Sequence, residues 1–316
     1  MNGVINIYKE AGYSSFHVVY EIRKLTGEQK VGHTGTLDPH VRGVLPVCIG
    51  KATKLVGQLT DTDKTYSCTM FIGRATDTQD YQGRTISEMD RDQVRKILTQ
   101  DETADPFARI CEVLHSFEGD IMQTPPMFSA LKVGGMKLVN AARKGLEVER
   151  KPRCVTIYSI DNIRQSSDLL YVSFDVRCSK GTYIRTLCND AGEKLGIPCC
   201  MYELERICAA GLGKESAITL EQARLYSDQG VLSDHIIPTD RFLENYPRLT
   251  VRDHIRNKVI YGNYFSPDDT DMPLHADDAY GAGTYRVYDR SGEFYALYRF
   301  DPRDSMFKCV KMFKDI

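Results

Sequence analysis

A glycine-punctuated stretch at residues 32–39, Gly-His-Thr-Gly-Thr-Leu-Asp-Pro, constrains this chain more than any other part of its sequence. Gly32 and Gly35 permit positive φ and close approach of the backbone to a ligand, while Pro39 biases the backbone of Asp38 toward extended geometry. A lone Leu-Asp-Pro would predict only a turn, because Asp, Gly and Pro dominate turns. The longer pattern favours a site around the Asp38 carboxylate, because it continues through residues 43–46 and 50–54.

Three further segments complete this pattern. They are Lys-Thr-Tyr at 64–66, Gln-Thr-Pro-Pro-Met-Phe-Ser-Ala-Leu-Lys at 123–132 and Cys-Ser-Lys-Gly-Thr-Tyr-Ile-Arg at 178–185. The four segments resemble, in the same order, the motifs of the TruB family of tRNA pseudouridine synthases, and the resemblance spans roughly residues 1–240. The chain departs from the family pattern at Glu10, where a proline is usual, and at Phe128, where a tyrosine is usual. These departures concern loop packing and leave the aspartate in place.

The resemblance implies three catalytic residues, Asp38, Tyr66 and Arg185. Asp38 matches the family's catalytic aspartate, and Arg185 matches the arginine that pairs with it. A nearby arginine favours the ionised carboxylate, typically lowering its pKa by about 1 to 3 units. Tyr66 matches an active-site tyrosine whose ring can stack on the base and whose phenol can help to move a proton. Sequence leaves open whether Asp38 adds to the base, adds to the sugar or assists a glycal-like intermediate.

The resemblance also implies contacts to substrate RNA. A uridine inside folded RNA must be flipped out, at a cost of a few kcal/mol. His33 matches a histidine that fills the space left by the flipped nucleotides, and Tyr183 and Leu204 match positions that line the base pocket. Lys64, Lys132 and Arg143 complete the expected RNA contacts. The isomerisation needs no redox step and no phosphate transfer, so we expect no cofactor.

Charge is unevenly distributed along the chain. The net charge is −2 and the pI about 6.4, so the whole sequence is not that of a strongly basic nucleic-acid binder. Residues 123–153, however, hold seven Lys and Arg against two Glu, a net charge of +5. Acidic residues gather at 77–105 and 268–271. We therefore expect an RNA-facing side with a basic insertion at 123–153 and an acidic, solvent-facing side.

The ten cysteines form no C-x-x-C pair and no zinc-type spacing with histidine, so no metal site is expected. Their scattering in apolar runs suits buried thiols in a reducing compartment. No signal peptide and no apolar run of membrane length is present, and we expect a cytoplasmic protein without membrane association.

The hydrophobic periodicity predicts an α+β fold of two domains. Residues 4–8, 64–72 and 170–178 read as strands of a mixed sheet of the pseudouridine synthase type. Apolar residues at helical spacing predict four helices. One follows Ser14 or Ser15, one spans 110–117, one follows Gly181, and one begins at a capping box at Thr219. Beyond residue 245, short Tyr-rich strands separated by Gly, Pro and Asp predict a small β-barrel. We expect a catalytic domain at 1–245 and, from its position in the resembled family, a PUA-like RNA-binding domain at 246–316.

These features predict a stand-alone, monomeric enzyme without an obligate protein partner, which isomerises uridine 55 in the TΨC loop of tRNA. The T-arm is the expected contact, and the acceptor stem is left open as a second one. One alternative is a dyskerin-type synthase that works with guide RNA and partner proteins. His33-Thr34-Gly35 and the start at Met1 to Val4 favour the stand-alone form. Another alternative is a catalytically dead RNA-binding or RNA-folding protein, against which Asp38, Tyr66 and Arg185 together argue.

Overall fold

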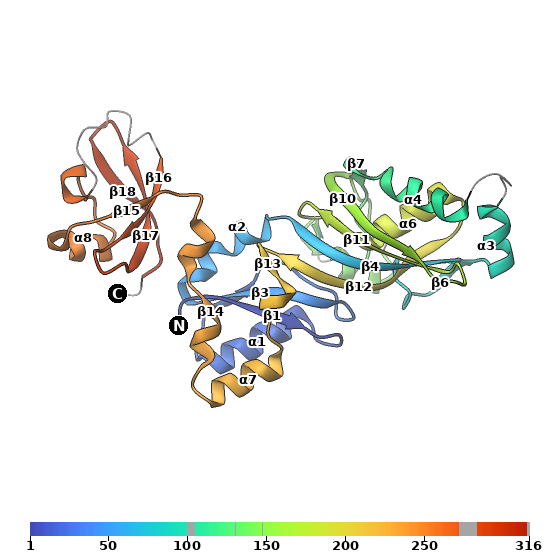
Figure 1. The fold of residues 1–316 in the computed structure, drawn as a ribbon, viewed down its shortest axis with the longest axis horizontal. Helices are drawn as coiled ribbons and strands as arrows, with labels where there is room; N and C mark the ends of the chain where they lie inside the picture. The colour runs from blue at the N-terminus through green and yellow to red at the C-terminus, as the bar shows by residue number, and fades with distance from the viewer. Residues whose placement is uncertain (100–104, 130, 147, 272–282, 315–316) are drawn as a thin grey trace.

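The computed structural model describes residues 1–316 except 100–104, 130, 147, 272–282 and 315–316. Among the described residues, ten strands form one large mixed sheet with the central order β14-β1-β3-β12-β4-β11-β10-β7; β2 pairs with β3, and β13 with β12 (Figure 1). The strands are β1 (Gly3–Lys9), β2 (Val31–His33), β3 (Arg42–Ile49), β4 (Lys64–Ile72), β7 (Gly119–Gln123), β10 (Arg153–Gln165), β11 (Tyr171–Cys178), β12 (Cys199–Ala209), β13 (Leu212–Gly213) and β14 (Ile236–Ile237). The expected mixed sheet is therefore present.

Helices cover the sheet in two groups (Figure 1). In one group α1 (Ser15–Thr26) packs on α7 (Leu220–Asp228) beside β1, and in the other α4 (Pro106–His115) packs on α6 (Ile184–Leu195) beside β10 and β12. α3 (Arg91–Leu98) adjoins α4. The predicted start of α1 is confirmed, because Ser14 caps its first turn, and Gly27 ends the helix with a left-handed φ of 67°. Thr219 and Gln222 form the predicted capping box of α7.

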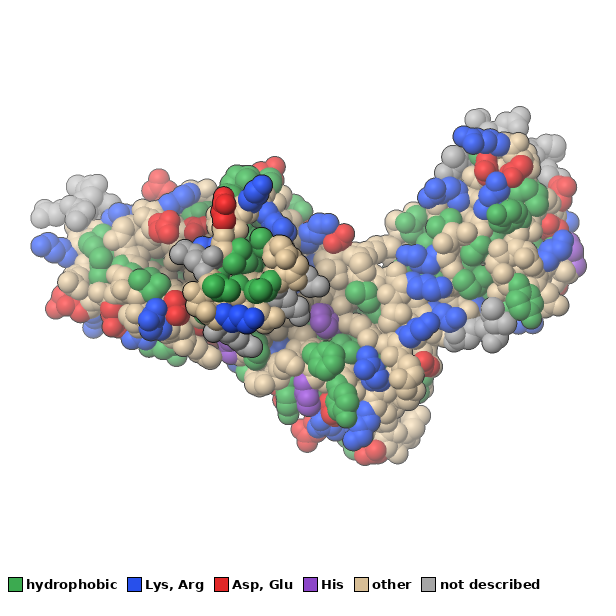
Figure 2. Space-filling model, turned by 180° about the vertical axis from the view of Figure 1, so that it is seen from behind, with side chains coloured by type: hydrophobic (Ala, Val, Ile, Leu, Met, Phe, Trp, Pro, Cys, Tyr) green, Lys and Arg blue, Asp and Glu red, His purple; other side chains and the backbone are tan. Residues whose placement is uncertain are grey.

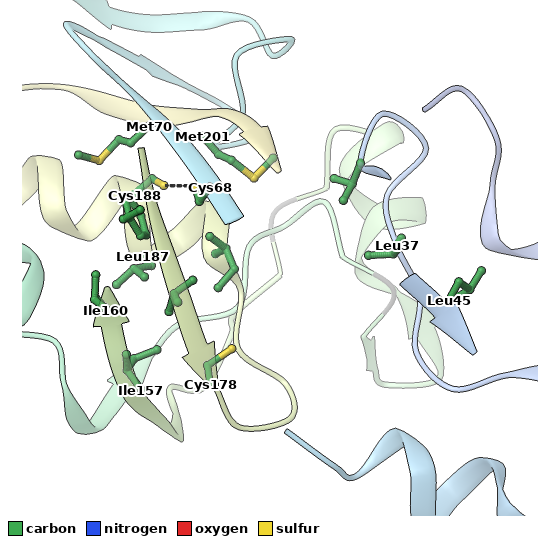
Figure 3. Packing of buried hydrophobic residues seen from close by; sticks show 14 of the residues in the cluster. Leu37, Leu45, Cys68, Met70, Ile157, Ile160, Cys178, Leu187, Cys188 and Met201 are labelled. Atoms are coloured by element: carbon green, nitrogen blue, oxygen red, sulfur yellow. Dashed lines mark hydrogen bonds between the residues drawn. The ribbon is translucent and has the colours of Figure 1, made fainter. Parts of the chain in front are cut away.

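Alternation along β4 produces the core of the larger sheet. Cys68, Met70 and Ile72 are buried on one face, as their period-2 spacing predicts. They pack with residues from α6 and β12, and Figure 3 shows Cys68 against Cys188 with Met201 and Leu187 close by. β4 pairs antiparallel with β12, which in turn pairs parallel with β3. These two pairings join the halves of the sheet. Lys64 and Tyr66 lie on β4, Leu204 lies on β12, and Asp38 lies on the loop that precedes β3.

A second sheet forms at the C-terminal end of the chain, in the order β15-β16-β17-β18. Its strands are β15 (Arg248–Thr250), β16 (Thr284–Tyr288), β17 (Phe294–Asp301) and β18 (Met306–Met312), accompanied by the short helix α8 (Arg256–Ile260). Leu249, Val251, Phe265, Tyr298 and Phe307 lie in its own buried cluster. The short strands predicted beyond residue 245 are thus confirmed. Among the described residues their pairings form an open path, so closure into a barrel stays a prediction.

Shorter elements complete the described chain. They are the 3-10 helices η1 (Gly50–Leu55), η2 (Lys214–Ser216), η3 (Leu232–His235), η4 (Thr239–Leu243), η5 (Asp253–Ile255) and η6 (Pro267–Asp269), the helices α2 (Val56–Thr60) and α5 (Leu138–Arg143), and the hairpins β5 (Arg74–Thr76) with β6 (Thr85–Glu88) and β8 (Lys132–Val133) with β9 (Met136–Lys137). All ten cysteines are free thiols, and six of them are buried. Within the described residues, no helix is both long enough and apolar enough to cross a membrane.

The two sheets share an apolar cluster where they meet. Leu297 and Phe313, from the C-terminal part, are buried in one cluster with Val4, Ala52 and Leu55 from the N-terminal part. The predicted boundary at residue 245 therefore lies beside a packed contact, because residues on both sides of it bury each other.

Candidate active site

The loop that carries Asp38 lies between β2 and β3 and is held from both sides of the aspartate. Ser15, in the first turn of α1, accepts a hydrogen bond from the Leu37 N–H at 2.9 Å and donates one to the Leu37 carbonyl at 3.1 Å. On the other side, the Pro39 carbonyl accepts from the Gly12 N–H at 2.8 Å and from Lys9 Nζ at 3.2 Å. The carboxylate between these contacts is 38% exposed. The backbone is therefore fixed while the acid stays open to a ligand.

Arg206, on β12, binds the backbone of the same loop and of β3. Its side chain is 1% exposed, and it donates from Nε to the Val44 carbonyl at 2.7 Å and from Nη2 to the Gly35 carbonyl at 3.1 Å. Gly43 has φ +121°, and a Cβ there would lie 2.2 Å from the Arg206 carbonyl oxygen. Only glycine allows β3 to approach β12 so closely at this point.

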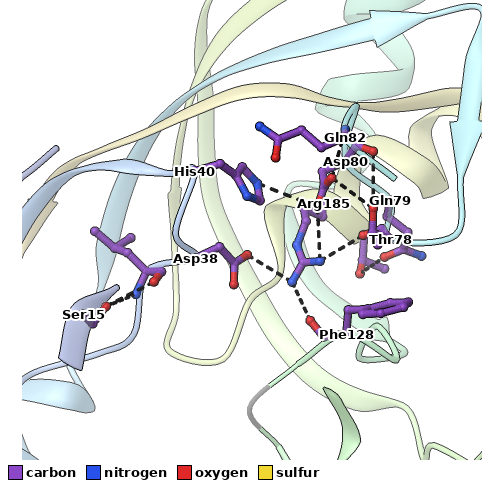
Figure 4. A network of polar contacts seen from close by, with 11 residues as sticks. Ser15, Asp38, His40, Thr78, Gln79, Asp80, Gln82, Phe128 and Arg185 are labelled. Atoms are coloured by element: carbon purple, nitrogen blue, oxygen red, sulfur yellow. Dashed lines mark hydrogen bonds and ion pairs between the residues drawn. The ribbon is translucent and has the colours of Figure 1, made fainter. Parts of the chain in front are cut away.

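Arg185 lies in the first turn of α6 and reaches the acid across the site (Figure 4). Its Nη2 is 3.1 Å from Asp38 Oδ2, which is the ion pair that the resemblance implied. Nη1 also donates to the Thr78 carbonyl and Nη2 to the Phe128 carbonyl, both at 2.9 Å. At 6% side-chain exposure, Arg185 is a buried, fully oriented cation and not a surface charge of the helix.

Asp80 is the acidic residue that sequence reasoning missed. The sequence predicts a solvent-facing side for the acidic run at 77–105, and for Asp80 this is wrong, because its side chain is only 7% exposed and its Oδ2 lies 3.6 Å from Arg185 Nη1. Its Oδ1 accepts from Thr78 Oγ1 at 3.0 Å and from the Gln82 N–H at 3.2 Å. The run of Asp and Thr around it is typical of turns, so its sequence carried no sign of burial.

Asp38, Arg185 and Arg206 border a cavity of about 530 Å³, a size typical of ligand pockets. Most of the predicted site residues line it: Asp38, Tyr66, Arg185, Tyr183, Leu204 and Lys64. They come from four separate segments of the chain. The structure therefore brings together in one pocket most of the residues that the motifs singled out.

Tyr66 and Tyr183 stand on rigid parts of the fold. Tyr66 lies on β4, and burial raises the pKa of its phenol, so that the phenol keeps its proton at neutral pH. Tyr183 precedes α6, and Gln123 holds its backbone with two hydrogen bonds, one to the Tyr183 carbonyl at 3.1 Å and one from its N–H at 2.8 Å. Gln123 opens the Gln-Thr-Pro-Pro segment and is 2% exposed, a positioning role that the sequence did not reveal.

Two residues expected to contact RNA, Lys64 and His33, are less exposed to solvent than a side chain that binds phosphate needs to be. Lys64 lines the cavity, but its side chain is buried and its ammonium already donates to the carbonyls of Thr60 and Thr62. His33 is half-buried, and its Nδ1 accepts from the Gly35 N–H at 3.2 Å. Burial, and after it the charge of Arg206, lowers the pKa of His33, which favours a neutral ring. The roles of both residues in RNA binding stay predictions.

The basic segment at 123–153 forms the hairpin of β8 and β9 followed by α5. The side chains of Lys132 and Arg143 lie outside the described residues, so the structure does not test them. Arg153 lines the cavity, and Arg150 donates to the Pro125 carbonyl at 3.1 Å. Among the described residues, no group of three or more His, Cys, Asp or Glu is placed to hold a metal ion.

Comparison with known proteins gives concordant matches. The profile of the TruB family pseudouridylate synthase N-terminal domain matches residues 23–184. A tRNA pseudouridine synthase B from Clostridium perfringens is 41% identical over 318 residues, covering 99% of both chains. One from Bacillus pumilus is 38% identical over 318 residues, covering 99% of this chain and 97% of its own. A chain from the structure of an H/ACA RNP bound to a substrate RNA containing 2′-deoxyuridine shares the fold, with a TM-score of 0.65 and 23% identity, covering 99% of this chain and 85% of its own.

Proposed function

The chain belongs to the TruB family of pseudouridylate synthases and is a tRNA pseudouridine synthase; from this premise we propose that its target is uridine 55 in the TΨC loop of tRNA. The observation that carries the proposal is the Asp38–Arg185 ion pair at a cavity lined by Tyr66, Tyr183 and Leu204. The arrangement offers one carboxyl group, one fixed cation and two aromatic rings around a space large enough for a base.

The reaction requires an acid of this kind and no co-reactant. The bond from ribose C1′ to uracil N1 breaks, a bond from C1′ to C5 forms, C5 loses its proton and N1 gains one. Asp38 acts as its carboxylate, either by adding to the base or sugar or by stabilising a glycal-like intermediate through its charge. Arg185 orients this carboxylate through the ion pair at 3.1 Å.

The remaining residues receive the flipped base. Stacking on an aromatic ring recovers about 1 to 3 kcal/mol per base, which offsets the cost of unstacking the uridine. We assign the stacking role to Tyr66, whose protonated phenol can also donate a hydrogen bond, and pocket walls to Tyr183 and Leu204. His33 is assigned the space that the flipped nucleotide leaves, with Lys64, Lys132 and Arg143 as further RNA contacts.

Residues 1–245 form the proposed catalytic domain, 123–153 its RNA-gripping insertion, and 246–316 a PUA-like domain that extends the RNA-binding surface. Figure 2 shows Lys and Arg side chains in a column where the C-terminal part meets the rest of the molecule. Lys54 and Lys311 lie side by side between the two parts, because Lys311 Nζ donates to the Lys54 carbonyl at 3.1 Å and Lys54 Nζ donates to the Met312 carbonyl at 2.6 Å. Burial, and after it the charges of Lys51, Lys30 and Lys311, lowers the pKa of Lys54. Such a cluster suits the phosphate backbone of the acceptor stem.

We propose that the enzyme acts in the cytoplasm as a monomer, on tRNA alone. The two full-length bacterial relatives favour this over a dyskerin-type enzyme that requires guide RNA and partner proteins. Asp38, Tyr66 and Arg185 are all present and line one cavity. This arrangement favours catalysis over a purely RNA-folding role.

The direct test is to incubate the purified protein alone with unmodified tRNA and to map pseudouridine along the molecule. We expect the wild-type protein to form pseudouridine at position 55 of the tRNA and Asp38→Asn to form none. Modification at another uridine would reject the target, and activity only after addition of a guide RNA would favour the dyskerin-type alternative.

A further inference from the structure

His40 lies two residues beyond Asp38, and its ring is directed toward the buried Asp80 (Figure 4). Nε2 of His40 is 3.7 Å from Asp80 Oδ2. This nitrogen is sealed from solvent and has no hydrogen-bond partner among the described residues, while the side chain as a whole is 26% exposed. One nitrogen of the imidazole thus faces a carboxylate in the interior, and the ring still has access to solvent.

Asp80 Oδ2 is shared between two cationic or potentially cationic groups. His40 Nε2 lies 3.7 Å from it on one side and Arg185 Nη1 3.6 Å from it on the other. Both distances exceed that of a direct hydrogen bond, so both groups interact with this oxygen through charge and neither is hydrogen-bonded to it. Arg185 in turn reaches Asp38 at 3.1 Å. His40, Asp80, Arg185 and Asp38 therefore form a chain of alternating charge when His40 is protonated.

Other charged groups near His40 do not compete for its sealed nitrogen. Arg42 follows on the same loop and pairs with Glu203 and Glu205. Lys9 donates to the Pro39 carbonyl beside His40, and its other two bonds go to the carbonyls of Glu10 and Tyr13. Asp80 is the carboxylate that the structure places against His40 Nε2.

We propose that His40 is a positioning residue whose protonation sets how Arg185 divides its charge between Asp80 and Asp38. With Nε2–H facing Asp80, the second proton enters at Nδ1. The added charge offsets more of the charge of Asp80, so Arg185 interacts more strongly with Asp38 when His40 is protonated. Histidine changes charge between about pH 5 and 8, the range in which such a device operates.

The inference rests on the proposed function, and its kinetic test compares wild-type enzyme with His40→Gln. Single-turnover rates of pseudouridine formation on unmodified tRNA are measured from about pH 5.5 to 8.5. We expect the ratio of wild-type to variant rate to be near one at the alkaline end. It should rise to about three- to tenfold at the acid end, which corresponds to a shift of the acid limb by about 0.5 to 1 unit. A ratio that stays constant with pH would overturn the positioning role.

A matched control is His254→Gln, because His254 Nε2 also faces a carboxylate, Asp269 Oδ1 at 2.9 Å, but in the C-terminal part of the chain. Its ratio should not change with pH, and the same rise as in His40→Gln would overturn the proposal.

A second measurement does not depend on activity. The imidazole nitrogens of full-length protein are titrated by NMR in wild type and in Asp80→Asn, with His254 as internal reference. We expect the His40 titration alone to move to lower pH in Asp80→Asn, because the variant loses a negative charge. Unchanged titration of His40 would overturn its link to Asp80. Absence of pseudouridine formation by wild-type enzyme would reject the proposed function, while this titration would still decide the link.

Discussion

Arg185 is nearly sealed from solvent and Asp38 is not: their side chains are 6% and 38% exposed, although Nη2 and Oδ2 are 3.1 Å apart. The guanidinium is oriented by the carbonyls of Thr78 and Phe128 before any RNA arrives. The cation is therefore part of the scaffold, and the acid is the member of the pair that a ligand can reach. This asymmetry separates the effects expected of substitutions at the two positions.

Replacing Asp38 with Asn should abolish isomerisation and leave tRNA binding within a few-fold of wild type. The amide keeps nearly the same shape but carries no charge, and affinity depends on basic residues elsewhere. Product formation and binding should be measured on the same tRNA. Substantial turnover by the variant would remove Asp38 from the chemical step.

Arg185→Met should lower both turnover and stability. The variant leaves Asp80 without its buried cationic neighbour and two carbonyls without their donor, and breaking a buried pair of this kind typically costs about 3 to 5 kcal/mol. Urea unfolding and single-turnover kinetics measure the two effects. Arg177→Met is the matched control, because Arg177 is 57% exposed in its pair with Asp63 and exposed pairs contribute at most about 1 kcal/mol.

If Arg185→Met weakened tRNA binding at an unchanged single-turnover rate, the guanidinium would be a phosphate contact and not the partner of Asp38. Arg185→Lys, which keeps the charge but loses the fork of donors, distinguishes geometry from charge.

Much of this architecture follows from local sequence rules. Ser14, Gly27 and Thr219 mark helix ends because capping is decided within a few residues, and the alternation along β4 identifies its buried face. The motifs identified Asp38 and Arg185, which the fold then places 3.1 Å apart. That distance could not follow from periodicity, because 147 positions separate the two residues in the sequence.

What local rules missed is burial of polar groups by distant segments. Asp80 reads as a turn residue, yet Arg185 and the fold of residues 76–84 enclose it. Lys64 reads as a basic contact, yet two carbonyls hold its ammonium. Lys9 is 0% exposed, although nothing in its neighbourhood in the sequence predicts a buried lysine. Each of these depends on tertiary partners that compensate the cost of desolvation.

Lys9 provides a pH-dependent test of the loop that carries Asp38. Burial lowers its pKa from 10.5 to about 8. Between these values the unfolded chain holds a proton that the folded chain has released, so the free energy of unfolding rises with pH. The gain from about pH 8 to 10.5 should approach about 3 kcal/mol. Urea unfolding of wild type and Lys9→Met across this range should show the stability difference growing in favour of wild type.

The control for this series is Lys258→Met, since Lys258 is exposed on α8. Its stability difference from wild type should stay flat over the same pH range. A flat difference for Lys9→Met as well would show that the three carbonyl acceptors around its ammonium preserve the charged form.

RNA binding by the C-terminal part is better tested by substitution than by truncation, because this part packs against the N-terminal part. Removing the chain after Asn245 would uncover Val4 and Leu55, which are buried with Leu297 and Phe313. Weaker tRNA binding by the truncated protein could then result either from lost RNA contacts or from impaired folding. Single replacements at the lysine cluster leave this apolar contact intact.

Lys30→Gln and Lys311→Gln should each weaken binding of whole tRNA while leaving binding of an isolated T-arm hairpin unchanged. Lys30 is exposed, and Lys311 donates across the junction to the Lys54 carbonyl at 3.1 Å. If each lysine neutralises one phosphate of the acceptor stem, the slope of log affinity against log salt should flatten by roughly 0.7 to 0.9 per variant. Lys194→Gln, on α6 with its ammonium over the Phe117 ring, is the control and should change neither affinity nor slope. Equal losses on hairpin and whole tRNA with an unchanged slope would mean that the C-terminal part supports the fold without touching RNA.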